Sequence, residues 1–258
     1  MKRKVNRRWR GALLGFALLL AGGMMVAAGI AQLSSTALAQ DDAATPRETG
    51  VISSPDEALV AVLADCADVA ALAPGELPPA GDGQSAYIIS GEPSEARYVV
   101  DEELASIGAN TAIGRTNAFT GQILIDDESM PAACSRFDVD MRTLVSDSSR
   151  RDNFLRGSTL QSDQFPIATF ILRAVEDLES ALDNEERTFT LIGDLVFRGQ
   201  TQLVAWEATA ALDGDELAGS AFIEFDMIDF GIDKPIVGSV VSIDDTIRLE
   251  VNIVAQQV

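Results

Sequence analysis

The chain has 258 residues, of which 47% are hydrophobic and 23% charged, and it contains only nine prolines. This composition excludes a wholly disordered protein and fits one folded domain with appendages. Histidine is absent, which excludes a Ser-His-Asp catalytic triad and a His-ligated zinc site. We therefore expect no metal site and no cofactor.

The charge is unevenly distributed along the chain. The first 39 residues carry six basic side chains and no acidic one, which leaves 13 basic and 40 acidic side chains from Gln40 onward. A body this acidic repels nucleic acid and anionic lipid. We expect neutral or apolar partners and no nucleic acid.

The amino terminus has the pattern of an export signal. A basic run over residues 2–10 precedes an almost uninterrupted apolar stretch over residues 11–33, and the small-residue triplet Ala37-Leu38-Ala39 follows. The triplet predicts cleavage after Ala39. The apolar stretch is also long enough to span a bilayer, so an uncleaved anchor in the membrane is the alternative. In both cases we expect the acidic body to be extracytoplasmic, in the periplasm or at the cell surface.

Export would place the two cysteines, Cys66 and Cys134, in an oxidising compartment where a disulfide is permitted. The loop that such a bond closes is worth roughly 4 kcal/mol of chain entropy. Two buried, unpaired thiols are the alternative, because the sequence gives no distance between the residues. A catalytic thiol is disfavoured because no histidine is present to activate it.

Residues 40–83 are predicted to form an acidic linker with one short helix. The segment Ser54-Pro55-Asp56-Glu57 has the spacing of a capping box with proline at the first helical position. We expect the helix to run through the alanine-rich stretch over residues 55–73, where a Pro-Gly pair ends it. The segment is expected to pack on its own domain as a short tether, and a role in binding a partner is the alternative.

After residue 83 the pattern changes to short runs in which apolar and polar residues alternate. This period of two is typical of half-buried strands. In the last run Ile247, Leu249, Val251 and Ile253 alternate with polar residues, so one face is dry and the other wet. The expected strands are residues 86–90, 96–101, 119–126, 137–142, 166–175, 188–198, 202–212, 220–227 and 246–255.

Eight or nine strands with turns between them, and one helical interruption near residues 148–160, predict an all-β fold. We expect an antiparallel barrel or a sandwich over residues 84–258. In the strand over residues 202–212 the sequence does not decide which alternate side chains face the interior, because either Leu203 or Val204 can face inward.

An eight-stranded barrel has an interior that its own side chains fill or that holds one slender ligand. The expected inward row offers no strong hydrogen-bond donor or acceptor, so it would penalise a polar guest and accept an aliphatic one. The candidate lining residues are Phe137, Val139, Met141, Phe170, Leu191, Leu195, Phe197, Ile223, Phe225, Leu249 and Val251.

Four motifs in a fixed order resemble the signature of the YceI-like family. They are Arg151-Asp152 with Leu155, the Phe-Pro-Ile-Ala-Thr-Phe run at 165–170, Gly193-Asp194-Leu195 with Gly199 and Thr201, and the Asp-Phe-Gly-Ile run at 229–232. The match covers residues 84–258. The sequence departs from the family pattern at Phe154, Phe165 and Leu203, where many members have His, Tyr and Pro.

The resemblance implies an extended, lipocalin-like antiparallel barrel of eight strands with a short helical crossover. It also implies export, a polyisoprenoid or isoprenoid-quinone-type lipid in the bore, and dimers in some members. A tube lined by aliphatic and aromatic groups shields such a chain from water at about 0.8 kcal/mol per methylene, without a bond being made or broken. We therefore predict a protein that is not an enzyme and that sequesters or carries an apolar isoprenoid-type lipid.

Two other functions stay open. A structural or stress-related envelope module would have a barrel filled by its own side chains and no extractable ligand. An enzyme that uses surface carboxylates would need a polar cleft with perturbed acid pKa values. The acidic runs at 126–128, 183–186 and 244–245 lack the spacing of a calcium loop.

Overall fold

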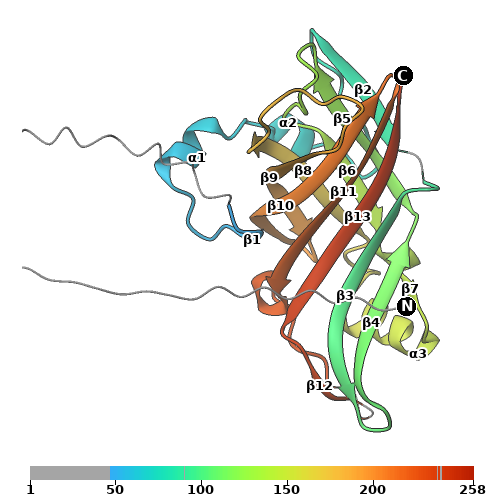
Figure 1. Ribbon diagram of the computed structural model, residues 1–258. Helices are drawn as coiled ribbons and strands as arrows, with labels where there is room; N and C mark the ends of the chain where they lie inside the picture. Colours follow the sequence, from blue (N-terminus) through green and yellow to red (C-terminus); the bar gives the residue numbers. More distant parts are fainter. Residues whose placement is uncertain (1–46, 90, 237, 239) are drawn as a thin grey trace, which may run out of the picture. The chain divides into compact units, whose positions relative to one another are not determined.

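The computed structural model describes residues 47–89, 91–236, 238 and 240–258, and the predicted signal or anchor segment over residues 1–39 lies outside them. Within this part of the chain, eight antiparallel strands close into a barrel, as predicted (Figure 1). In order round the ring they are β2 (Gln84–Ile89), β5 (Phe119–Asp126), β6 (Arg136–Asp140), β8 (Ile167–Glu176), β9 (Arg187–Phe197), β10 (Gln200–Asp213), β11 (Glu216–Asp226) and β13 (Thr246–Gln257).

At one end the sheet continues beyond the closed ring. β3 (Glu95–Leu104) pairs with the first half of β13, and β4 (Gly108–Thr116) pairs with β3 along its whole length. β7 (Val145–Ser146) adds to β4, and β12 (Val240–Ile243) pairs with the far end of β3. β2 and β3 therefore follow the same edge of β13, and β3, β4 and β12 lengthen the wall at the lower end of Figure 1.

A helical segment connects β7 to β8, as the sequence predicted. It consists of α3 (Ser149–Phe154) and the π-helical η2 (Leu155–Thr159), and the 3-10 turn η1 (Met141–Thr143) precedes β7. Asp152 of α3 is buried and accepts hydrogen bonds from both the backbone N–H and the hydroxyl of Ser146, at 2.9 and 2.6 Å. These bonds fix the helical segment to the short strand β7.

Among the residues that the structure describes, no helix is long and apolar enough to cross a membrane.

Residues 50–72, which we call the outer strap, cover part of the outer face of β8, β9 and β10. β1 (Gly50–Val51) pairs antiparallel with β10. In α1 (Glu57–Val62), Leu59 packs on Ile192 and its neighbours in the sheet, and both side chains are almost completely buried. Apolar residues on the outside of these strands therefore contact the outer strap and not water.

The outer strap holds two short helices where the sequence predicted one. The predicted helix over residues 55–73 breaks after α1, because the Ala64 N–H donates to the carbonyl oxygen of Arg173 on β8 at 3.0 Å. α2 (Ala67–Ala70) follows the break. The cap of α1 is Asp56, two residues later than predicted. Pairing with the sheet thus overrides the local helix propensity.

A disulfide and a buried ion pair attach α2 to the barrel. Cys66, the residue before α2, is bonded to Cys134, which precedes β6. Arg136 on β6 forms an ion pair with Asp138 at 3.0 Å, and both side chains are at least 95% buried. The same guanidinium donates to two carbonyl oxygens of the outer strap at 2.9 and 3.0 Å. The charges are therefore paired and hydrogen-bonded, as burial requires.

The motif over residues 229–232 follows β11 and contains a bend that glycine permits. The 3-10 turn η3 (Met227–Phe230) follows the strand, and Gly231 ends the turn in the left-handed region with φ 63°. Phe230 is fully buried against two other phenyl rings. The motif therefore folds a hydrophobic turn over one part of the interior.

The interior of the barrel contains two clusters of apolar side chains. On β10, Val204 and Trp206 belong to the inner cluster, whereas Leu203 packs outward beneath the outer strap, which settles the parity of this strand. One end of the barrel is filled by Tyr87, Ile89, Ile125, Leu182, Phe189, Ala208, Leu217 and Ala255. The other end is hollow.

Candidate ligand-binding cavity

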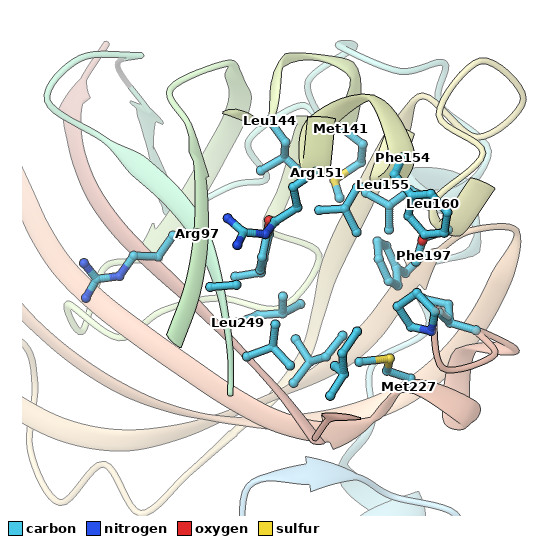
Figure 2. A pocket seen from close by; sticks show the side chains of 18 of the residues that line it. Arg97, Met141, Leu144, Arg151, Phe154, Leu155, Leu160, Phe197, Met227 and Leu249 are labelled. Atoms are coloured by element: carbon cyan, nitrogen blue, oxygen red, sulfur yellow. The ribbon is translucent and has the colours of Figure 1, made fainter. Parts of the chain in front are cut away.

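A cavity of about 890 Å³ occupies the end of the barrel next to α3. This volume lies within the range of about 300–1,000 Å³ that is typical of small-molecule sites. Figure 2 shows Met141, Leu144, Leu155, Phe197 and Leu249 pointing into one common space from strands, from the helical segment and from the turn over residues 141–144. The walls are predominantly apolar, so the cavity is suited to a ligand that makes van der Waals contacts.

Nine of the eleven predicted lining residues line this cavity. They are Phe137, Val139, Met141, Phe170, Leu195, Phe197, Phe225, Leu249 and Val251. Leu191 instead lines a smaller cavity deeper in the barrel, and Ile223 is fully buried in the packing of the wall. These two residues also face the interior, so the alternation identified the correct face but not the depth along the strand.

Several lining residues were not among those predicted from the sequence. One group is Phe154, Leu155 and Leu160 in the helical segment; a second is Tyr98, Val100, Leu104 and Ala112 on β3 and β4; a third is Met227, Ile232, Pro235 and Ile236 in and after η3. The adjacent pair Phe154-Leu155 in an otherwise polar segment was the signal that could have found the first group.

A polar edge bounds the cavity beside α3. Arg151 donates to the carboxylate of Glu102 on β3 at 2.8 Å and also forms an ion pair with Asp147. The Glu102 carboxylate, only 5% exposed, accepts a further hydrogen bond from Asn110 at 2.9 Å. The ion pair therefore joins α3 to the extended part of the sheet, and its charges are neutralised within the wall.

Tyr98 on β3 lines the cavity close to Arg151. Burial raises the pKa of the Tyr98 hydroxyl to about 12, and the positive charge of Arg151 opposes this shift only in part. Gly114 on β4 makes room for the ring, because a Cβ atom at that position would lie 2.2 Å from Cε1 of Tyr98. The hydroxyl is therefore protonated at neutral pH and brings no charge into the cavity.

Three aromatic side chains, which we call the aromatic floor, close the inner end of the cavity. Phe137, Phe170 and Trp206 line both this cavity and a second one of about 80 Å³. The ring centroids of Phe137 and Phe170 are 5.4 Å apart, and those of Phe170 and Trp206 are 5.9 Å apart. The barrel is thus hollow on the α3 side of the floor and largely packed on the other side.

One further pair of charged residues lies in the wall between β3 and β13. Arg97, which Figure 2 shows turned away from the cavity, forms an ion pair with Glu250. In the part of the chain that the structure describes, no group of three or more Cys, Asp or Glu side chains is placed to hold a metal ion. The chemistry that the cavity offers is therefore burial of apolar surface with a polar edge.

The sequence matches the YceI-like domain over residues 87–255, well over half of the chain. The chain belongs to the YceI-like family. This confirms the resemblance that the four sequence motifs indicated. A curated relative, a UPF0312 protein from Vibrio vulnificus, is 26% identical over 171 residues, which cover 60% of this chain and 86% of the relative.

Two solved structures have a fold similar to that of this YceI-like protein. BcnA from Burkholderia cenocepacia matches with a TM-score of 0.53 and 16% identity, over 65% of this chain and 99% of BcnA. A polyisoprenoid binding domain from Saccharophagus degradans, implicated in plant cell wall breakdown, matches with a TM-score of 0.54 and 12% identity, over 67% of this chain and 98% of that domain. At these identities the likeness shows the fold, and the function must be argued from the cavity.

Proposed function

We propose that this protein is an exported binding protein that sequesters or carries an apolar isoprenoid-type lipid, a polyisoprenoid or an isoprenoid quinone, in its barrel. The observation that carries the proposal is the cavity of about 890 Å³ with predominantly apolar walls. The Saccharophagus degradans domain is described as polyisoprenoid-binding, and the shared fold supports the same class of ligand here.

The energetics of burial favour such a ligand. Each methylene group that moves from water into the cavity contributes about 0.8 kcal/mol, so several isoprene units outweigh the entropic cost of association. A strongly polar ligand would lose hydrogen bonds to water, and Glu102 and Arg151 are already bonded to each other. Carriage or sequestration requires no bond to be made or broken, so the proposal includes no catalytic residue.

The export part of the proposal is supported by the leader pattern over residues 1–39 and by the bond between Cys66 and Cys134. Disulfides persist in oxidising compartments and are rare in the cytosol. Cleavage after Ala39 would release the barrel into the periplasm or medium, and an uncleaved segment would tether it to the membrane. Mass spectrometry of the mature amino terminus distinguishes the two forms.

Organic extraction of the natively purified full-length protein, followed by mass spectrometry, tests the ligand class. We expect an isoprenoid lipid in the wild type and loss of that lipid in Leu249→Arg, which places a charge in the cavity wall. Asn252→Arg on the exposed face of the same strand is the matched control and should retain the lipid. Light scattering on the same samples tests for the homodimer that the family resemblance implies.

A wild-type protein that yields no lipid and takes up none from added polyprenols would contradict the proposal. The barrel would then be a structural envelope module.

A further inference from the structure

We infer that the aromatic floor sets the length of lipid chain that the cavity accepts, with the apolar end of the ligand at the floor and its polar end at the α3 edge. This inference rests on the proposed function and adds the residues that determine specificity. It is carried by the arrangement of the two cavities, by two glycines in close contact with Phe137 and Phe170, and by the absence of charge behind the floor.

The first observation is that the floor separates two spaces that are otherwise adjacent. Phe137, Phe170, Trp206 and Val251 line the main cavity of about 890 Å³ and also the small cavity of about 80 Å³. These four side chains are the partition between the two. Removal of one phenyl ring would join the cavities, whereas a larger side chain at Val251 would thicken the partition.

The second observation is that two glycines allow neighbouring strands to approach Phe137 and Phe170 closely. Gly121 pairs with Phe137 across β5 and β6, and a Cβ atom at Gly121 would lie 2.4 Å from Cβ of Phe137. A Cβ atom at Gly193 would lie 2.6 Å from Cζ of Phe170. Neither glycine has a positive φ, so both positions hold glycine for the close approach and not for an unusual backbone conformation.

The third observation is that charge is absent behind the floor. No charged side chain lines the small cavity there. The main cavity has five charged lining residues: Arg97 and Glu250, which pair with each other, Glu102 and Arg151, which also pair, and Arg150 on α3. A hydroxyl, carbonyl or phosphate group would lose its hydrogen bonds at the floor but keep them at the α3 edge. The isoprenoid tail therefore points toward the floor.

These three observations make the floor a limit on chain length. Once the tail reaches the aromatic rings, further methylene groups have no apolar space and stay in water. Burial of about two methylene groups corresponds to roughly a tenfold change in affinity. The affinity is therefore expected to rise with chain length up to a limit and then to stop rising.

In the test, purified full-length protein is incubated with a mixture of polyprenols of graded chain length. Native mass spectrometry then identifies the bound species. Phe170→Ala opens the floor and should shift the bound population to longer chains, by roughly tenfold for the first chain beyond the wild-type limit. Val251→Phe should shift it to shorter chains. Phe222→Ala on β11 is the matched control, because this ring lines neither cavity, and its limit should equal that of the wild type.

Loss of a buried ring can also destabilise the fold, so the milder Phe170→Leu variant and a thermal unfolding curve for each protein accompany the binding data. A folded variant with Phe170 or Val251 replaced and an unchanged length limit would overturn the inference while the lipid-binding function stands. Failure of the wild type to bind any polyprenol would instead overturn the proposed function and the inference together.

Discussion

Phe170 on β8 lies over Gly193 on the neighbouring strand β9, so closely that a methyl group at Gly193 would meet both the phenyl ring and the carbonyl oxygen of Ile171, the latter at 2.2 Å. Contacts this short cannot be relieved by the movement of a flexible side chain alone, because one of the two partners is backbone. The packing of the barrel interior at this point therefore depends on the absence of a single carbon atom.

Gly193→Ala is expected to lower the free energy of unfolding by about 1–3 kcal/mol, the usual cost of overpacking a core. Urea denaturation measures the change. Gly157→Ala in η2 is the control, since no heavy atom lies within 4 Å of the added carbon. Similar losses of stability in the two variants would show that the close approach to Phe170 has no energetic importance.

A second prediction concerns the loss of stability when the buried ion pair of Arg136 and Asp138 is broken. Arg136→Met leaves the Asp138 carboxylate buried with hydrogen bonds from Gly75 and Thr169 but no countercharge, so we expect a loss of about 3–5 kcal/mol. The double variant Arg136→Met with Asp138→Asn should recover part of that loss, because no unpaired charge remains. A double-mutant cycle by chemical denaturation measures the coupling, and strictly additive effects would argue against it.

An exposed pair on the same part of the barrel provides the comparison for that cycle. Arg142 pairs with Asp140 at 2.7 Å, but its side chain is 55% exposed. Arg142→Met should therefore change the free energy of unfolding by no more than about 1 kcal/mol.

The disulfide between Cys66 and Cys134 spans 68 residues of sequence. Its reduction is expected to lower the free energy of unfolding by roughly 4 kcal/mol, through the greater chain entropy of the unfolded state. The double variant Cys66→Ser with Cys134→Ser should show the same loss and should not respond to reductant. Unfolding curves with and without reductant test this, and a reductant effect that persists in the double variant would contradict it.

A further prediction concerns how the stability of the protein depends on pH through the ionisation of Tyr98. Its pKa is raised from 10.0 to about 12 by burial, so the unfolded chain releases this proton at a lower pH than the folded chain does. Stability therefore falls as the pH rises from 10.0 toward about 12. Absorbance titration of the folded protein should show a tyrosine that ionises later than free tyrosine. Tyr98→Phe should lose that transition, and a Tyr98→Phe protein that still shows it would assign the transition to Tyr87.

The alternation of apolar and polar residues predicted the barrel well because each strand has one dry and one wet face. On β13, Leu249 and Val251 lie on the cavity side as their spacing indicated, and Asn252 is exposed. β4 was missed because its sequence, GANTAIGRT, is rich in glycine, asparagine and threonine and has few large apolar residues. It forms a strand because β3 offers it a complete row of backbone partners.

The depth of the cavity could not be predicted from the sequence. Periodicity indicates which face of a strand a residue occupies, but it carries no information about the position of that residue along the barrel axis. Leu191 and Leu195 therefore looked equivalent, although they line different cavities. The sequence predicted the helical segment near residues 148–160, but a search for a period of two could not show that its side chains reach the cavity. Phe154 and Leu155 reach the cavity from a helix that the long-range bond between Arg151 and Glu102 holds in place.

The outer strap has a practical consequence for anyone who shortens this chain. A fragment that begins at Gln84 would keep every strand of the ring but would leave Ile192 uncovered on an outer face and Cys134 as a lone thiol. An apolar surface exposed to water, next to an accessible thiol, promotes aggregation and intermolecular disulfide formation. The smallest well-behaved version of this protein should therefore start upstream of Gly50, well before the family domain begins.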